Sequence, residues 1–210
     1  MAKRIALAVA GLMLAWSVAG YAQGGPAVGA KIGTLGFGLE AGMGFTDSIG
    51  GRLGLNYMTL GRDAKESDIE YDVDLDFMSV TALLDWHPFK GGFRVSGGLL
   101  YNGNEFTGDA EGELDVGDDG PYPDATLKAK IDFNNIAPYL GIGWDTSFGK
   151  EKQFGFICDL GIVFQGSPKV SLTGTGVPAD ELAKEEKELK DALEDFKFWP
   201  VISVGLIYRF

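Results

Sequence analysis

The sequence predicts an all-β fold: a closed antiparallel up-and-down barrel of eight strands that crosses a membrane. Three observations predict it. Apolar residues alternate with small or polar residues over long segments, aromatic residues gather near the ends of those segments, and the first 22 residues have the pattern of a secretory signal. After the signal, no run approaches the roughly 18 apolar residues that indicate a transmembrane helix.

The composition excludes several other classes of protein. The 210 residues include 32 glycines, one cysteine and one histidine, and they carry a formal net charge of −12. One cysteine excludes an internal disulfide framework, and one histidine with one cysteine excludes the usual zinc sites. The acidic balance argues against nucleic acid as a partner, because phosphate binding needs clustered lysines and arginines.

Residues 1–22 indicate a cleaved secretory signal peptide. Lys3 and Arg4 precede an apolar run from residue 5 to residue 20, and the small residues Gly20 and Ala22 suit a cleavage after Ala22. A transmembrane anchor is the alternative, but this run is short for a span of about 20 residues. Cleavage leaves residues 23–210 as the barrel domain, with 16 basic and 30 acidic groups and a net charge of −14.

The first two strands are recognised because the apolar residues move from even-numbered to odd-numbered positions between them. Apolar residues occupy even positions up to Ile32 and odd positions from Leu35 onward. Such a shift of the apolar positions needs a turn or a bulge. We therefore expect a first strand over Ala27–Gly33, a very tight turn near Gly33–Gly36 and a second strand over Phe37–Phe45. A bulge, which would leave seven strands or place an extra strand in a loop, is the alternative.

The six remaining strands show the same alternation. They are expected to include Leu53–Tyr57, Val80–Trp86, Phe93–Tyr101, Pro138–Trp144, Phe154–Phe164 and Pro200–Phe210. A soluble sandwich would also alternate. However, most of these strands are longer than the usual strand of globular sheets. In addition, the side chains on their polar faces are too small to form the exterior of a soluble protein.

Short and long connections alternate along the chain. The short ones are residues 46–50, 88–92 and 148–152, and the long acidic ones are about residues 61–70, 107–124 and 165–197. Outer-membrane barrels have short periplasmic turns and longer external loops. We therefore expect the three long segments to be external loops, and the last strand to run inward.

Two of these loops have features of their own. The seven acidic residues within 108–124 indicate a solvated loop, because their spacing lacks the pattern of a calcium loop. Divalent cations that bridge this loop to lipopolysaccharide phosphates are the alternative. Pro178–Lys197 predicts a short amphipathic helix, with Asp180 and Glu181 near its positive end. We expect this helix to pack as a lid on the barrel mouth or on neighbouring loops, with docking of a partner or lipid as the alternative.

The inward face of a narrow barrel should be filled by its own side chains. The predicted polar network of the lumen consists of Glu40, Arg52, Asn56, Asp85, Arg94, Tyr139, Asp159 and Arg209. An unpaired charge would be costly there, so we expect Arg52 and Arg94 to lie among Glu40, Asp85 and Asp159. The network predicts a plug, and a narrow gated path for small solutes or ions is the alternative.

The sequence gives little support to an enzyme. A barrel that deacylates lipid A needs a serine and a histidine together on the external side. The single histidine, His87, falls at a short turn that is expected to be periplasmic and interfacial, and Cys158 falls on the lipid-facing side of its strand. We therefore predict no catalytic residue, no cofactor and no metal site.

Several segments resemble a known family. They include residues 33–40, 83–89, 91–98, 137–144 and 164–170 and the terminal 208–210. The chain resembles the small outer-membrane protein A-type barrels of proteobacteria, without the periplasmic peptidoglycan-binding domain of larger relatives. The resemblance implies an eight-stranded barrel in the outer membrane of the Gram-negative cell envelope. Tyr208 and Phe210 resemble the signal that the barrel assembly machinery reads.

The sequence thus predicts an integral outer-membrane barrel with a structural or surface-interaction role. A narrow, porin-like channel is the alternative, and an enzyme that modifies lipid A is the least favoured function. The expected partners are outer-membrane lipid and lipopolysaccharide, with periplasmic chaperones and the barrel assembly machinery during biogenesis. The oligomeric state is left open.

Overall fold

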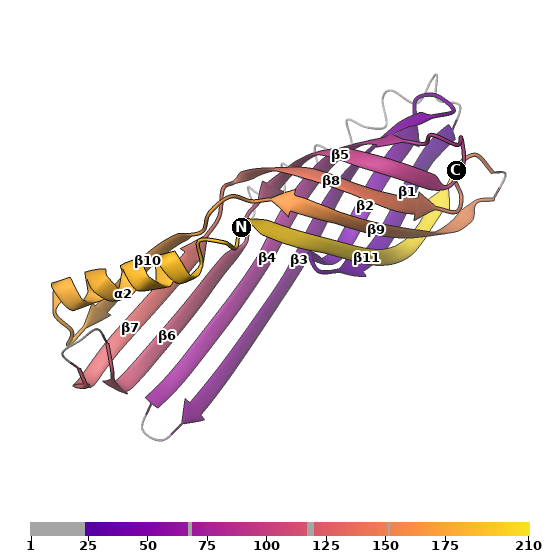
Figure 1. Cartoon of the computed structure of the whole chain (residues 1–210). Helices are drawn as coiled ribbons and strands as arrows, with labels where there is room; N and C mark the ends of the chain where they lie inside the picture. Colours follow the sequence, from indigo (N-terminus) through magenta and orange to yellow (C-terminus); the bar gives the residue numbers. More distant parts are fainter. Residues whose placement is uncertain (1–23, 67–68, 117–119, 151) are drawn as a thin grey trace.

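Eight strands of the chain close into an antiparallel barrel (Figure 1). The computed structural model describes residues 24–66, 69–116, 120–150 and 152–210. In the order of the ring, the strands are β1 (Gly24–Gly33), β2 (Gly36–Gly44), β3 (Ile49–Glu66), β4 (Ile69–Trp86), β5 (Phe93–Asn102), β8 (Ile136–Asp145), β9 (Phe154–Phe164) and β11 (Phe198–Arg209). The predicted fold class is therefore confirmed, and the expected signal at residues 1–22 lies outside the described residues.

The barrel closes between its first and last strands. β1 pairs with β11 in a register that sets Ala27 opposite Arg209 and Gly33 opposite Ser203. The predicted tight turn between β1 and β2 is confirmed, because Gly33 lies directly opposite Gly36 across the pair. Gly36 has a φ of +93°, a conformation that glycine adopts without steric cost. The alternative of a bulge at this turn is wrong.

The outward face of the barrel is apolar and exposed. Phe154, Phe156 and Leu84 expose 74%, 70% and 63% of their surfaces, which would promote aggregation in water but suits lipid. Exposed aromatic residues mark both ends of this belt. Near the short turns they are Phe45, Trp86, Trp144, Phe154 and Phe210, and at the other end they are Phe37, Tyr57, Tyr101, Phe164 and Phe198.

Beyond one end of the ring, the sheet continues as a flap. β3 and β4 are 18 residues long, and their distal halves extend past the barrel. The distal part of β4 pairs with β6 (Glu105–Leu114), which pairs with β7 (Tyr122–Asp132), which pairs with β10 (Lys169–Thr175). We call this five-stranded assembly the extension sheet; it consists of residues 59–66 and 69–76 with β6, β7 and β10 (Figure 1).

The extension sheet corrects the prediction of three long loops. Residues 61–70, 107–124 and 165–197 were expected to be loops, but most of them form strands or helix. The physical reason is visible in β6, where Phe106, Ala110 and Leu114 alternate with acidic residues. The acidic residues of these segments therefore line the solvated face of a sheet instead of a solvated loop.

The predicted helix is present but shorter than expected. α2 spans Ala179–Ala192, with Pro178 at its N-cap, and it ends because Leu193 has φ −95° and ψ 1°. It packs on β10 of the extension sheet rather than on the mouth of the barrel (Figure 1). The Glu186 carboxylate accepts a hydrogen bond from the backbone N–H of Leu172 at 3.0 Å. No helix among the described residues is long and apolar enough to cross a membrane.

Candidate functional site

Arg52 of β3 lies at the centre of a charged network inside the barrel. Its Nη2 lies 2.8 Å from Asp159 Oδ1, and its Nε lies 2.9 Å from Asp85 Oδ2. Its Nη1 lies 3.3 Å from Glu40 Oε2. The carboxylates come from β9, β4 and β2, so one guanidinium joins four strands across the lumen. All four side chains are buried, and charge-assisted hydrogen bonds of this kind are strong.

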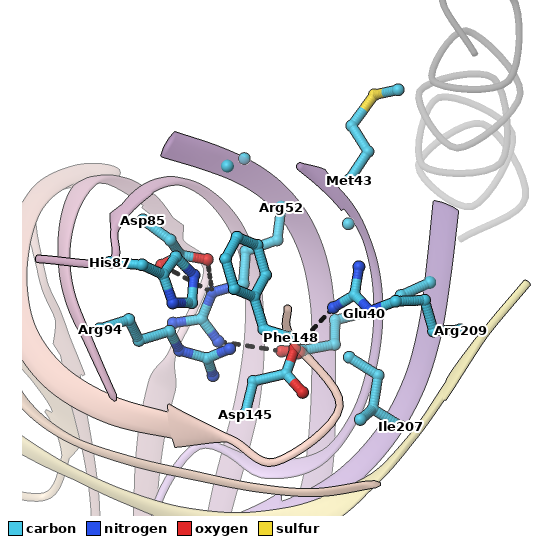
Figure 2. A pocket seen from close by; sticks show the side chains of 14 residues that line it. Glu40, Met43, Arg52, Asp85, His87, Arg94, Asp145, Phe148, Ile207 and Arg209 are labelled. Carbon is cyan, nitrogen blue, oxygen red and sulfur yellow. Dashed lines mark hydrogen bonds and ion pairs between the residues drawn. The ribbon is translucent and has the colours of Figure 1, made fainter. Parts of the chain in front are cut away.

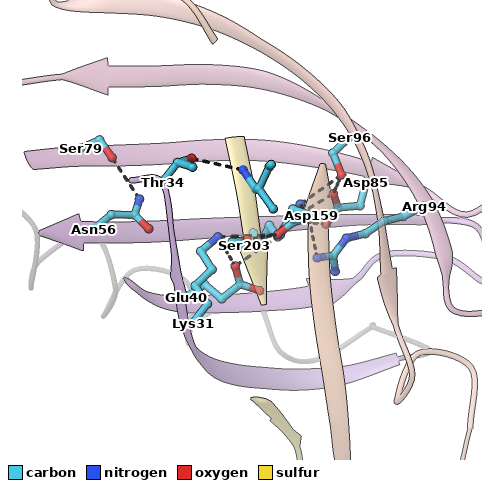
Figure 3. Close-up of polar contacts among 12 residues, drawn as sticks. Lys31, Thr34, Glu40, Asn56, Ser79, Asp85, Arg94, Ser96, Asp159 and Ser203 are labelled. Carbon is cyan, nitrogen blue, oxygen red and sulfur yellow. Dashed lines mark hydrogen bonds and ion pairs between the residues drawn. The ribbon is translucent and has the colours of Figure 1, made fainter. Parts of the chain in front are cut away.

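Two further cations complete the network (Figure 3). The Arg94 Nη2 donates to Asp159 Oδ1 at 2.9 Å, and the Lys31 Nζ lies 2.8 Å from Glu40 Oε2. Three cations therefore balance three carboxylates, and the network carries no net charge. Lys31 was not among the predicted network residues. Its odd position in β1, where the even positions are apolar, is the signal that places it inward.

Hydroxyl and amide groups form further hydrogen bonds in and around the network, and Arg94 Nε is a buried atom of the network with no hydrogen-bond partner among the described residues. The Ser96 hydroxyl donates to Asp85 Oδ1 at 2.5 Å, and the Ser203 hydroxyl donates to Asp159 Oδ2 at 3.3 Å. The predicted Asn56 is buried and donates from Nδ2 to the Ser79 hydroxyl at 3.0 Å. Buried polar groups are stable when they are paired in this way.

The predicted Tyr139 also lies inside the barrel, where its ring fills space left by glycine. Its side chain is buried in an apolar cluster with Leu83, Leu100 and Val163. A Cβ atom on Gly161 would lie 2.5 Å from the Tyr139 hydroxyl oxygen and 2.7 Å from its ring. The glycine on β9 thus provides the room that the aromatic ring occupies.

Aromatic rings fill the barrel end next to the extension sheet. Neighbouring rings lie 5.4 to 6.4 Å apart between centroids. The members of this aromatic cluster are Phe77, Phe106, Phe133, Phe196 and Trp199. They come from β4, β6, β11 and the connections after β7 and α2, so the extension sheet contributes directly to the filling of the lumen. The sequence did not reveal this cluster, because Phe106 falls between the predicted strand that ends at Tyr101 and the predicted loop that begins at residue 107.

The opposite end is closed by a second layer, around Phe148 (Figure 2). The His87 ring stacks on the Phe148 ring, with centroids 3.5 Å apart and planes 2° apart. The Arg209 guanidinium lies 5.5 Å from the centre of the same ring and donates to Asp145 Oδ2 at 2.7 Å. A small cavity of about 20 Å³ separates this layer from Arg52 and Arg94, which is room for roughly one water molecule.

His87 corrects another expectation. It lies at the short turn after β4, as expected, but only 2% of its surface is exposed, so it is not interfacial. The ring turns inward because it stacks on Phe148 and because Nδ1 lies 2.7 Å from the carbonyl oxygen of Gly91. Burial lowers the pKa of His87 below its ordinary value.

Within the described ranges, no group of three histidine, cysteine, aspartate or glutamate residues could hold a metal ion.

Comparison with known proteins identifies the fold. Neither protein-family models nor curated proteins match the sequence. Among solved structures, CarO2 of Acinetobacter baumannii is similar over 90% of this chain and 100% of its own, with 22% identity and a TM-score of 0.62. CarO of the same organism is similar over 89% of this chain and 98% of its own, with 22% identity and a TM-score of 0.60. The chain therefore has the fold of these small eight-stranded β-barrels, and its charged network occupies the lumen of that fold.

Proposed function

We propose that the chain is an integral outer-membrane barrel with a closed lumen and a structural or surface-interaction role. The observation that carries the proposal is the pairing of an apolar exterior with a filled interior. The belt between the aromatic girdles suits lipid, and the fold is that of the CarO barrels. The extension sheet, with its acidic face, then lies outside the membrane.

Three successive layers support a closed lumen. The aromatic cluster fills one end, the network around Arg52 fills the middle, and the layer of His87, Phe148 and Arg209 fills the other end. To open a path, the barrel would have to separate buried ion pairs, which costs several kcal/mol for each charge that is left unpaired. A channel for small solutes therefore receives less support than a plug.

Ion conductance of the refolded protein in planar lipid bilayers tests the proposal. We expect no steady conductance from the natural sequence, because side chains occupy the lumen in each of the three layers. The matched variants Arg52→Ala and Arg94→Ala remove charges from the middle layer. Steady, reproducible openings that change in either variant would show that the middle layer lines a conducting path, and the closed-lumen proposal would then be wrong.

A separate experiment tests the barrel in detergent. A closed barrel is expected to migrate differently in detergent gels before and after boiling, and to show a far-ultraviolet spectrum dominated by sheet. Identical migration together with a spectrum that lacks sheet would contradict a stable barrel in detergent. This outcome would be distinct from the appearance of conductance, which would contradict only the closed lumen.

We further propose that lipopolysaccharide and the barrel assembly machinery are partners of this chain. Tyr208 and Phe210 support the second partner, because Phe210 is 63% exposed on the lipid-facing side and packs against Tyr208 with ring centroids 4.9 Å apart. Replacement of Phe210 by alanine is expected to lower the yield of folded barrel in cells. Refolding of the purified variant in detergent should be unchanged, since no machinery is needed there.

A further inference from the structure

The extension sheet has two outer edges, and the structure protects only one of them. At the edge of β10, the helix α2 packs alongside, and Glu186 accepts the backbone N–H of Leu172. At the opposite edge, β3 pairs with β2 only as far as Tyr57, which lies opposite Phe37. In the described part of the chain, no strand pairs with this side of β3 from Thr59 onward. An open edge of this kind presents backbone donors and acceptors to a further strand.

The two faces beside this open edge differ in chemistry. On the face that continues the barrel exterior, Asp63 of β3 lies opposite Asp72 of β4, and Gly61 lies opposite Asp74. On the face that continues the lumen, Leu60 and Val73 are 50% and 42% exposed, and the exposed Arg62 lies opposite Val73. The edge therefore offers carboxylates on one face, and on the other it offers apolar surface beside the single cation of Arg62.

The carboxylates next to the open edge lack the cations that neutralise the middle of the sheet. On β6 and β7, Lys128 Nζ lies 3.0 Å from Asp109 Oδ2, and Lys130 Nζ lies 2.8 Å from Glu105 Oε2. Among the side chains that the structure describes, no lysine or arginine forms an ion pair with Asp63, Asp72 or Asp74, and Arg62 points to the opposite face from them. Partial loss of hydration and the neighbouring carboxylates of Asp63 and Asp74 raise the pKa of Asp72. Carboxylates without an ion-pair partner among the described side chains therefore lie on one face of the edge where backbone groups are unpaired.

We propose that the open edge of β3, residues 59–63, binds an extended cationic peptide segment in which apolar and basic residues alternate. The segment adds to the extension sheet as a further strand. Its backbone pairs with β3, its basic side chains face Asp63 and Asp72, and its apolar side chains cover Leu60 and Val73. Backbone pairing supplies affinity in this mode of recognition, and the alternate side chains supply specificity.

The chain itself contains a strand with this chemistry. In β7, Ala125, Leu127, Ala129 and Ile131 alternate with Thr126, Lys128 and Lys130, and the lysines pair with acidic residues of β6. A second copy of the chain fits the open edge less well. A two-fold pairing of β3 with β3 would place both acidic faces on the same side, where their charges repel.

A labelled copy of residues 125–131, acetylated and amidated at its ends, is a suitable probe. Its binding to the full-length protein in detergent is measured by fluorescence anisotropy. We expect saturable binding that weakens as salt is added, and loss of binding when both lysines of the peptide are replaced by glutamate. A probe with N-methyl groups on alternate backbone amides should bind roughly tenfold more weakly, because it cannot pair with the edge.

Two double variants of the protein locate the site. Asp72→Asn with Asp74→Asn should weaken binding of the probe by roughly tenfold, whereas Glu105→Gln with Asp109→Asn should leave it unchanged. The second variant is the matched control, since it removes two carboxylates that already face the lysines of β7. If only the control variant weakens binding, the probe replaces β7 and the proposal is wrong.

Two other outcomes also overturn the proposal. Equal binding of the N-methylated probe would mean adhesion by charge alone, without strand addition. A stable dimer that dissociates when β3 is altered and excludes the probe would make a second copy the occupant. The inference rests on the proposed surface role, but the two can fail separately, since probe binding in detergent does not depend on conductance in bilayers.

Discussion

At the scale of single residues, Arg52 has the greatest influence on the lumen. Its guanidinium contacts Glu40, Asp85 and Asp159, and each of these carboxylates is buried. Arginine suits this position because its planar fork donates several hydrogen bonds at once and keeps its charge. The network therefore forms only when the closed ring of strands brings these four side chains together.

Replacement of Arg52 by alanine is expected to lower the free energy of unfolding by about 3 kcal/mol, because it leaves buried carboxylates without their shared cation. Urea titration of the folded barrel in lipid, followed by gel migration, measures this loss. Lys128→Ala is the matched control. It removes an exposed ion pair to Asp109, and exposed pairs contribute roughly 0–1 kcal/mol. Equal losses in the two variants would contradict the central role of Arg52.

His87 predicts a dependence of stability on pH. The folded protein lowers the pKa of this ring below 6.5, so the unfolded chain takes up the proton first as the pH falls. Stability is therefore complete above about pH 7 and decreases as the pH falls through the ordinary histidine range toward pH 5. Urea titrations at several pH values should show this slope, and His87→Gln should remove it. A slope that persists in the variant would assign the effect to other groups.

At the scale of elements, the strands of the barrel pack through matched large and small side chains. Tyr139 of β8 fills the space beside Gly161 of β9, and a Cβ on Gly98 of β5 would collide with the backbone of β4. The many glycines of the sequence therefore have two uses in the barrel: they admit close strands, and they admit aromatic rings. This packing explains how the lumen is filled although many inward positions are glycine.

Gly161→Ala is expected to destabilise the barrel by about 2 kcal/mol, because the added methyl group meets the Tyr139 ring. Tyr139→Ala removes that ring, so Gly161→Ala should cost little in a Tyr139→Ala background. Urea titration of the two single variants and the double variant measures the coupling. Gly97→Ala is the control, since its nearest neighbour would lie 4.0 Å away. Strict additivity of the two losses would contradict the proposed packing.

The whole molecule combines two assemblies with opposite surroundings. The barrel has an apolar exterior and a charged interior, whereas the extension sheet has an acidic face and an apolar face. On β3 the exterior changes from Tyr57, in the belt, to Thr59, which hydrogen bonds to Asp76 at 2.7 Å. From Ile49 to Tyr57 the strand rises about 27 Å, at about 3.4 Å per residue, which fits a tilted crossing of the apolar layer.

Tryptophan fluorescence in brominated lipid bilayers tests this placement. Trp86 and Trp144 are 53% and 47% exposed at the girdle, whereas Trp199 belongs to the aromatic cluster in the lumen. Variants that retain only Trp86 or only Trp144 should be quenched strongly by bromines near the lipid headgroups. The variant that retains only Trp199 should be quenched weakly. Strong quenching of Trp199 by bromines of any depth would contradict its position inside the barrel.

The sequence predicted the barrel better than it predicted the extension sheet. In the barrel, lipid demands strict alternation, so residues such as Phe154 and Phe156 mark the outward face clearly. The same alternation predicts that Arg52 and Asp159 face the lumen, although it cannot predict which of their atoms form hydrogen bonds. In the extension sheet, one face meets water, so acidic residues such as Asp109 and Glu111 concealed the alternation of β6. The stacking of His87 on Phe148 depends on two distant turns, and no local pattern encodes it.

The pairing of β1 with β11 has a consequence for the rate of folding. It joins Ala27 to Arg209, which are 182 positions apart, so the ring cannot close until almost the whole chain is present. Contacts between residues this far apart slow the folding of β proteins, since chain entropy is lost before the contacts form. Until that last pairing forms, the intermediate has two unpaired strand edges and an opened charged interior, neither of which lipid can solvate. Closure of the ring is therefore expected to be the slow, all-or-none step of assembly.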